Sequence, residues 1–120
     1  MEDVIQPLAS ADDFAAVRQE IEAVTIDQSI YDYTLRLLIT SRQSPQLTLG
    51  ASPRAGRGWI RAARVLAVLR ERNFITPDDI KELAYPILRH RLVRKPETEI
   101  EGTTVEQVID QLLASVEVPR

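Results

Sequence analysis

Apolar residues recur at helical spacing in five separate stretches of this sequence, and this periodicity most constrains the fold. In the stretch at 53–72, the apolar side chains that fall on one side of a helix, at about 100° per residue, are Trp59, Ile60, Ala63, Leu66 and Ala67. Comparable stretches lie at 10–24, 27–42, 76–92 and 103–116. Because such helices must bury their apolar sides against one another, the sequence predicts an all-α bundle of about five helices with no significant sheet.

Three of the expected helices begin with a recognisable capping sequence. Thr76 precedes Pro77 and two acids. The Thr76 hydroxyl can accept from the first N–H groups of the helix, and Pro77 fits the first turn because the N–H that proline lacks would have no partner in the helix there. Asp78 and Asp79 are therefore interpreted as first-turn residues that face the positive end of the helix dipole, rather than as a catalytic pair. The other two starts are marked by Ser10 with Asp13 and by Ser52 with Pro53.

The same patterns predict buried side chains and interruptions. In the first helix, a buried stripe is expected at Phe14, Val17, Ile21 and Val24. Pro86 is expected to kink its helix, since it lacks the N–H that would bond to the preceding turn. The segments 44–50 and 94–102 are expected to be a loop and a charged connector.

Charge is distributed unevenly along the 120 residues, whose formal net charge is −3. No acid occurs between Asp32 and Glu71, whereas that stretch holds seven arginines, namely Arg36, Arg42, Arg54, Arg57, Arg61, Arg64 and Arg70. Such a basic island favours an anionic partner, which could be nucleic acid, a nucleotide phosphate or an acidic protein surface. The acidic remainder argues against general coating of nucleic acid.

Several classes of protein are disfavoured by what the sequence lacks. It has no cysteine, which fits a reducing compartment such as the cytoplasm, and no apolar run long enough to span a membrane. Its one histidine, His90, cannot form a metal site alone, and no phosphate-binding loop or nucleophile motif is present. We therefore expect no bound metal and no free-standing enzyme.

The strongest candidate site is the helix start at Ser52, Pro53 and Arg54. A helix N-terminus offers unpaired N–H groups and a positive dipole, so an added guanidinium creates a site for phosphate. The alternative is that Arg54 reaches solvent or pairs with an acid from another helix. Arg57 would either assist at this site or lie at the surface.

The remaining basic residues are open to more than one interpretation. Arg61 and Arg64 form either a solvated face or a contact with an acidic neighbouring subunit. His90 either donates a hydrogen bond at the end of its helix or contacts another subunit. The alternative to a nucleotide site is a helical module that reads nucleic acid with the arginines of the third helix, or an adaptor that docks an acidic protein.

Several segments, taken in order, carry a resemblance to a known family. They are VIQPLASADDFAAVRQEIEAV at 4–24, YDYTLRLLITSR at 31–42, LGASPRA at 49–55, FITPDDIKELAYPILRHRL at 74–92 and EIEGTTVEQVIDQLLASVEVPR at 99–120. Together they strongly resemble the C-terminal helical lid of MoxR-type AAA+ ATPases. The resemblance implies a linker from a missing ATPase core at 1–9 and the lid domain at 10–120. One departure is Glu71-Arg72-Asn73, where relatives commonly have glycine and arginine before the aromatic residue.

The resemblance also implies roles for the candidate residues. In this family the GASPR motif supplies the sensor-two arginine, here Arg54, to the γ-phosphate of ATP, which is bound with Mg²⁺ by a P-loop core domain. Ser52, Pro53 and Arg57 would lie on the phosphate side. The residues implied at contacts with the core or the next subunit are Arg61, Arg64, His90 and Arg91. Such ATPases work as rings, expected to be hexamers, in chaperone-like maturation or assembly of client proteins, and no nucleic acid is expected as a partner.

Overall fold

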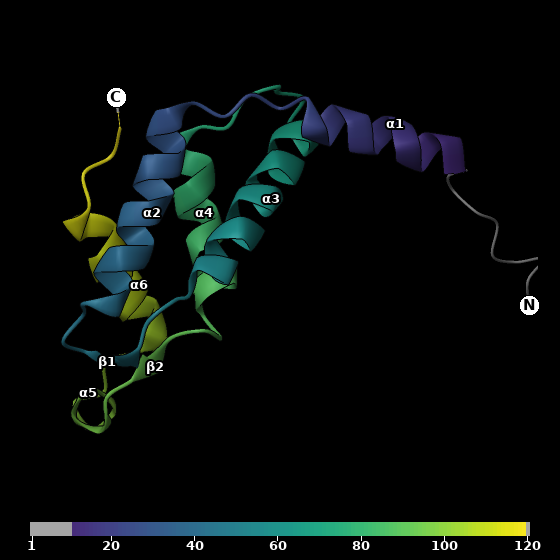
Figure 1. Ribbon diagram of the computed structural model, residues 1–120. Helices are drawn as coiled ribbons and strands as arrows, with labels where there is room; N and C mark the ends of the chain where they lie inside the picture. Colours follow the sequence, from purple (N-terminus) through teal and green to yellow (C-terminus); the bar gives the residue numbers. More distant parts are fainter. Residues whose placement is uncertain (1–10, 120) are drawn as a thin grey trace, which may run out of the picture.

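Helices make up most of the protein in a computed structural model that describes residues 11–119 (Figure 1). The helices within that range are α1 (Ala11–Glu22), α2 (Gln28–Arg42), α3 (Pro53–Leu69), α4 (Pro77–Leu88), α5 (Pro96–Ile100) and α6 (Val105–Ser115). The strands β1 (Leu47–Leu49) and β2 (Val93–Arg94) pair antiparallel. The prediction of an all-α fold is confirmed, with α5 as an additional helix.

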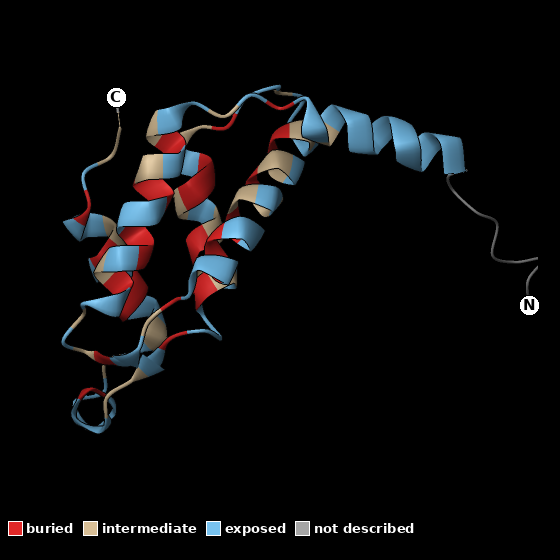
Figure 2. Ribbon diagram, in the orientation of Figure 1, coloured by how far each residue is buried: buried red, intermediate tan, exposed pale blue. Residues whose placement is uncertain are grey.

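The hydrophobic core lies between α2, α3, α4 and α6 (Figure 2). Trp59 of α3 is fully buried, and its Nε1–H donates to the carbonyl oxygen of Ile80 in α4 over 2.9 Å. Buried side chains recur at helical spacing and are Ile30, Thr34, Leu37, Leu38 and Ser41 in α2, Trp59, Ala63 and Ala67 in α3, and Val108, Ile109 and Leu112 in α6. Helical spacing therefore located the core correctly.

α1 projects away from the other helices, and the buried stripe predicted for it is wrong (Figures 1 and 2). Phe14 and Val17 are 65% and 47% exposed, and α1 contains no buried residue. Ile21 is partly covered, and Val24, which follows the helix, is buried. The periodicity showed which side of α1 is apolar, but only the C-terminal end of the helix lies beside α3 (Figure 1). The predicted cap Ser10 lies outside the described residues.

The segments expected to be a loop and a charged connector contain regular structure. β1 and β2 pair across them, with Leu47 opposite Arg94, and the Lys95 N–H donates to the Gln46 carbonyl over 2.9 Å. The chain then forms α5, in which Thr98 is buried. Both predictions were wrong because strands of three and two residues and a helix of five are too short to show a periodic pattern.

α4 begins as the sequence predicts. The Thr76 hydroxyl accepts from the Asp79 N–H over 3.3 Å, and the Asp79 carboxylate accepts from the Thr76 N–H over 2.9 Å, which completes a capping box. Pro77 lies in the first turn, and the helix continues through Pro86 to Leu88. The interpretation of Asp79 as a capping residue is confirmed.

Asp79 also joins the start of α4 to the end of α3. Its side chain is 1% exposed and accepts from the Arg72 guanidinium over 2.6 and 2.8 Å. Burial alone would raise the pKa of Asp79, but hydrogen bonds from Arg72 and Thr76 and the charge of Arg72 together lower this pKa below 3.8. Arg70, which belongs to the basic island, also pairs with Asp79, at 3.5 Å, and with Glu82, at 2.7 Å.

Asp79→Asn should lower the free energy of unfolding by about 3 kcal/mol at pH 7, because it deprives the Arg72 guanidinium of its buried partner. A carboxylate whose pKa is lowered on folding stabilises the protein above its unfolded pKa, and this contribution is lost as the pH falls through the folded pKa. The stability difference between wild type and variant, measured by urea denaturation, should therefore shrink below about pH 4. Asp78→Asn removes the same charge at an exposed position and should change stability by less than about 0.5 kcal/mol. An equal loss in both variants would contradict the role given to Asp79.

The turn after α3 explains how the chain accommodates Glu71-Arg72-Asn73. Glu71 has a positive φ of 57°, the left-handed conformation that glycine adopts without a steric penalty. The Arg72 N–H donates to the Ala67 carbonyl over 2.8 Å and the Glu71 N–H donates to the Val68 carbonyl over 3.0 Å, which is the pattern of a Schellman C-cap. The turn thus has a geometry that suits glycine although a glutamate occupies it.

Glu71→Gly should raise the free energy of unfolding by up to about 1 kcal/mol, because it removes the strain of a Cβ in the left-handed region. Gln111→Gly is the matched control at an exposed position inside α6, where glycine should cost about 1 kcal/mol. Thermal denaturation of the two variants measures both effects. A loss of stability in Glu71→Gly comparable with that of the control would show that the turn is not strained.

Candidate functional site

The helix start at Ser52, Pro53 and Arg54 forms the first turn of α3, as the sequence predicts. Ser52 has extended backbone angles, with φ −89° and ψ 164°, and Pro53 begins the helix. The Ser52 side chain accepts no hydrogen bond from the helix, in contrast to Thr76 and Thr104 at the starts of α4 and α6. The first N–H groups of α3 therefore have no side-chain cap, and their partial positive charge is available to an anion.

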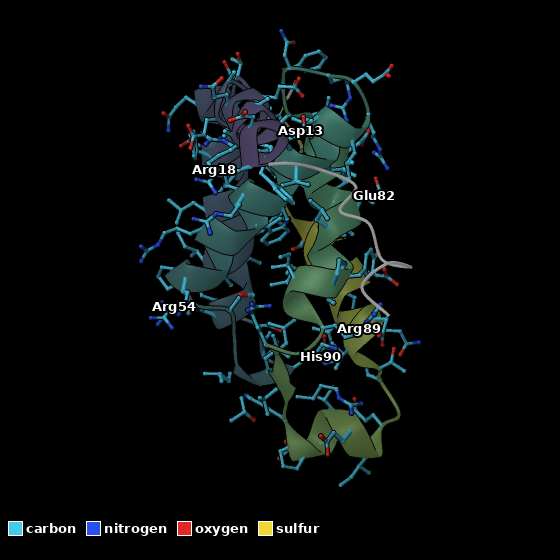
Figure 3. The ribbon with its side chains drawn as sticks, turned by 90° about the vertical axis from the view of Figure 1, so that its right-hand side faces the viewer. Asp13, Arg18, Arg54, Glu82, Arg89 and His90 are labelled. Atoms are coloured by element: carbon cyan, nitrogen blue, oxygen red, sulfur yellow. The ribbon has the colours of Figure 1, made fainter. Side chains whose placement is uncertain are left out.

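Arg54 is exposed, and its side chain points away from the helices (Figure 3). Within residues 11–119, no carboxylate forms an ion pair with it. The guanidinium therefore lies in solvent beside the positive end of the α3 dipole, a position that is unfavourable until an anion is present. The structure thus contains no ion pair between Arg54 and another described helix, and the phosphate site stays a prediction.

The position of this helix start is fixed by contacts with the end of α2. The Ala51 N–H donates to the Ser41 hydroxyl over 3.1 Å, and that hydroxyl donates to the Leu38 carbonyl over 2.7 Å. A Cβ on Gly50 would lie 2.6 Å from the Arg42 Cα, which is closer than two such carbon atoms can approach. Glycine therefore lets the chain cross directly over the α2 backbone just before α3 begins.

Gly50→Ala should lower the free energy of unfolding by about 1–3 kcal/mol, because the added methyl group meets backbone atoms that cannot rotate aside. Gly58→Ala is the matched control, since a Cβ there meets nothing within 4 Å. The control should gain up to about 1 kcal/mol from better helix propensity. Urea denaturation measures both changes, and the packing argument fails if the Gly50 variant is as stable as wild type.

A groove of about 850 Å³ lies between α1, α2 and α3, and we call it the α1–α3 groove. Its charged lining residues are Arg18 and Glu22 of α1 and Arg57, Arg61 and Arg64 of α3. Its apolar lining residues include Ile21, Tyr31, Leu35, Leu38, Ile60 and Val65. The structure therefore groups Arg57 with Arg61 and Arg64 in the lining of the groove, whereas Arg54 is not among the lining residues.

The sequence alone identifies only some of the arginines that line this groove. Those of α3 form a visible stripe at spacings of three and four residues. Arg18 stands on α1 (Figure 3), in a segment that also contains several acids. The fold alone brings it to the same groove. The signal that could have indicated the groove is the apolar side of α1, which periodicity reveals but which the expected bundle would have buried in the core.

The other predicted interface residues follow the C-terminal end of α4. His90 and Arg91 are exposed, and Nη1 of Arg91 donates to the Ile87 carbonyl over 2.6 Å. α3 and α4 run in opposite directions, so His90 and Arg54 lie toward the same end of the bundle (Figures 1 and 3). The candidate phosphate site and the predicted His90-Arg91 contact therefore share one end of the molecule.

The part of the chain that the structure describes lacks the features of two other kinds of site. No helix there is long and apolar enough to cross a membrane. No three His, Asp or Glu side chains among residues 11–119 gather as a metal ion would require. The exposed charge of the candidate regions is instead mainly that of arginines, which suit phosphate and carboxylate groups.

Comparison with known proteins identifies relatives of the chain. Residues 39–112 match the family described as the AAA lid domain. The chain is 33% identical to the uncharacterised protein YeaC of Bacillus subtilis, over 98% of its own length and 37% of that protein. It is 36% identical to Chaperone MoxR1 of Mycobacterium tuberculosis, over 85% of its own length and 30% of that protein. A crystal structure of a candidate ATPase from Cytophaga hutchinsonii matches 96% of this chain with a TM-score of 0.88 and 33% identity, and 38% of that protein is covered.

The chain spans only part of each of these relatives. In each of the three, the matched segment is between 30% and 38% of the relative's length. The chain therefore corresponds to about a third of each longer protein, and the match shows the type of domain rather than the activity of the whole.

Proposed function

Because the chain belongs to the AAA lid domain family, as the lid of a MoxR-like AAA+ ATPase, we propose that Arg54 is its sensor-two arginine. In this role the guanidinium donates hydrogen bonds to the γ-phosphate of ATP held by a P-loop core domain. The 120 residues contain no P-loop motif, so this domain alone is expected to hold ATP weakly and not to hydrolyse it. The observation that carries the proposal is an exposed guanidinium, unpaired among residues 11–119, at an uncapped helix start within LGASPRA.

The residues at the start of α3 fit a triphosphate. The first N–H groups lack a cap from Ser52, and Arg54 adds a full positive charge beside them. Ser52 and Pro53 would lie on the phosphate side, with Arg57 one turn further along the helix. ATP with Mg²⁺ supplies the phosphoryl group that is transferred to water. Arg54 would stabilise negative charge on that group and so make the position of the lid depend on the nucleotide state.

The proposal extends to the arrangement of the longer protein. Residues 1–9 would connect the core domain to a lid that spans 10–120. The residues proposed to contact the core or the next subunit of a ring, taken to be a hexamer, are Arg61, Arg64, His90 and Arg91. One relative is named a chaperone, and we propose that this ATPase likewise couples ATP turnover to maturation or assembly of client proteins, in the cytoplasm.

Arg54→Ala, made in the longer ATPase that contains this lid, should lower the maximal rate of ATP hydrolysis by about tenfold to a hundredfold, because one cationic donor to the γ-phosphate is lost. Steady-state hydrolysis at saturating and limiting ATP measures the change. Arg57→Ala removes the same charge one turn further along α3 and should have a smaller effect.

A fold control uses the 120-residue chain itself. Arg54 is exposed and unpaired among the described residues, so Arg54→Ala should leave the circular dichroism spectrum unchanged. It should not lower the melting temperature, since a cation at a helix start is unfavourable. A loss of ATPase activity without a loss of folding would then assign the effect to the phosphate contact. Hydrolysis unaltered at both ATP concentrations would exclude Arg54 from the sensor-two role.

A further inference from the structure

We propose that the α1–α3 groove binds an acidic, amphipathic helix presented by another polypeptide chain. This inference specifies the chemistry of the contact proposed above for Arg61 and Arg64, and it does not depend on the role of Arg54. Three properties of the groove support it: its charge, its apolar lining and the spacing of its arginines.

The charge of the groove is strongly positive and is not neutralised within the described residues. Four arginines, Arg18, Arg57, Arg61 and Arg64, line it together with one acid, Glu22. None of the four forms an ion pair within residues 11–119, although other arginines of the chain do. The Nε atom of Arg64 is buried and has no hydrogen-bond partner among the residues that the structure describes. A buried donor without a partner is unfavourable, so an acceptor supplied from outside would be stabilising.

The apolar lining distinguishes a protein helix from a nucleic acid as the occupant. Leu35, Tyr31 and Val65 are 54%, 40% and 37% exposed, although each lines the groove. A sugar-phosphate backbone would pair with the arginines but leave these side chains in contact with water, because interfaces with nucleic acid are predominantly polar. An amphipathic helix covers apolar side chains with its own and places carboxylates at the edge. The combination of apolar lining and arginines therefore favours the helix.

The spacing of the arginines on α3 specifies where the acids of the partner should lie. Arg57, Arg61 and Arg64 are separated by four and three residues, which places them along one side of the helix. A helix lying beside α3 has the same repeat, so three acids separated by three and four residues can face the three arginines. The charges of the two helices also determine the direction in which the partner helix runs, because like charges opposite one another are unfavourable.

A binding experiment with the 120-residue chain tests this arrangement. The probe is a fluorescein-labelled helical peptide of about 18 residues, with leucines on one side and three glutamates at the spacing complementary to Arg57, Arg61 and Arg64. Fluorescence anisotropy should show saturable binding that is weaker by at least about tenfold in an Arg61→Glu, Arg64→Glu double variant. A second peptide, with lysines in place of the three glutamates, should bind the double variant better than it binds wild type.

Matched controls separate the groove from net charge. Arg36→Glu with Arg42→Glu changes the net charge equally at exposed positions of α2 that do not line the groove, and should leave peptide binding within about twofold of wild type. A scrambled peptide of the same composition should bind at least about tenfold more weakly than the patterned one. Recovery of binding by the lysine peptide shows that the double variant is folded.

Several outcomes would overturn the proposal. Equal binding of the scrambled peptide, or equal loss in the α2 control variant, would show non-specific attraction. Tighter binding of a DNA duplex of about 20 base pairs through the same arginines would assign the groove to nucleic acid. Light scattering that shows a dimer abolished by Arg61→Glu, Arg64→Glu would assign it to a second copy of this chain.

Discussion

The arrangement of the remaining structure depends on the contacts that the buried Asp79 carboxylate makes with Arg72 and Thr76. It accepts from Arg72, which follows α3, and from the backbone N–H of Thr76, which caps α4, so one side chain bridges the two helices. Burying the ionised carboxylate of Asp79 costs free energy, which the charge of Arg72 and the hydrogen bonds from Arg72 and Thr76 offset. These contacts form only when the turn between α3 and α4 has this shape. A turn of this shape makes α3 and α4 run antiparallel. As a result, the start of α3 with Arg54 and the end of α4 with His90 lie toward the same end of the bundle (Figures 1 and 3).

Local sequence signals predicted those parts of the fold that depend on local physics. The Thr76 capping box and the burial of Trp59 follow from capping chemistry and from a repeat of 3.6 residues, and both are observed. α1 shows the limit of this approach, because the apolar side containing Phe14 needs a partner that periodicity cannot place. The pairing of β1 with β2 and the left-handed Glu71 could not be predicted either. They depend on contacts between distant segments and on a turn that the surrounding bonds impose on an unfavourable residue.

The candidate site was predictable to a similar degree. An arginine at a helix start is unfavourable unless an anion binds, and this conflict draws attention to Arg54 and Arg57 in the amino-acid sequence. The resemblance carried by LGASPRA then singles out Arg54. The sequence does not reveal that the Ser52 hydroxyl leaves the helix uncapped, since a serine before a proline ordinarily indicates a cap. Nor does it divide the arginines of the basic island into groups. The fold divides them, because Arg70 is used in the Asp79 network while Arg61 and Arg64 line the α1–α3 groove.

α3 connects the two regions for which we propose functions, and it is held at both ends. At its start, Gly50 and Ala51 pack against the end of α2, and at its end the Arg72–Asp79 pair holds the following turn to α4. Trp59 adds a buried hydrogen bond to α4 between these points. A helix fixed in this way moves as a unit, since its backbone hydrogen bonds resist bending. When Arg54 moves toward or away from a phosphate, the groove-lining arginines on the same helix must therefore move with it. The alternative is that the contacts holding α3 rearrange.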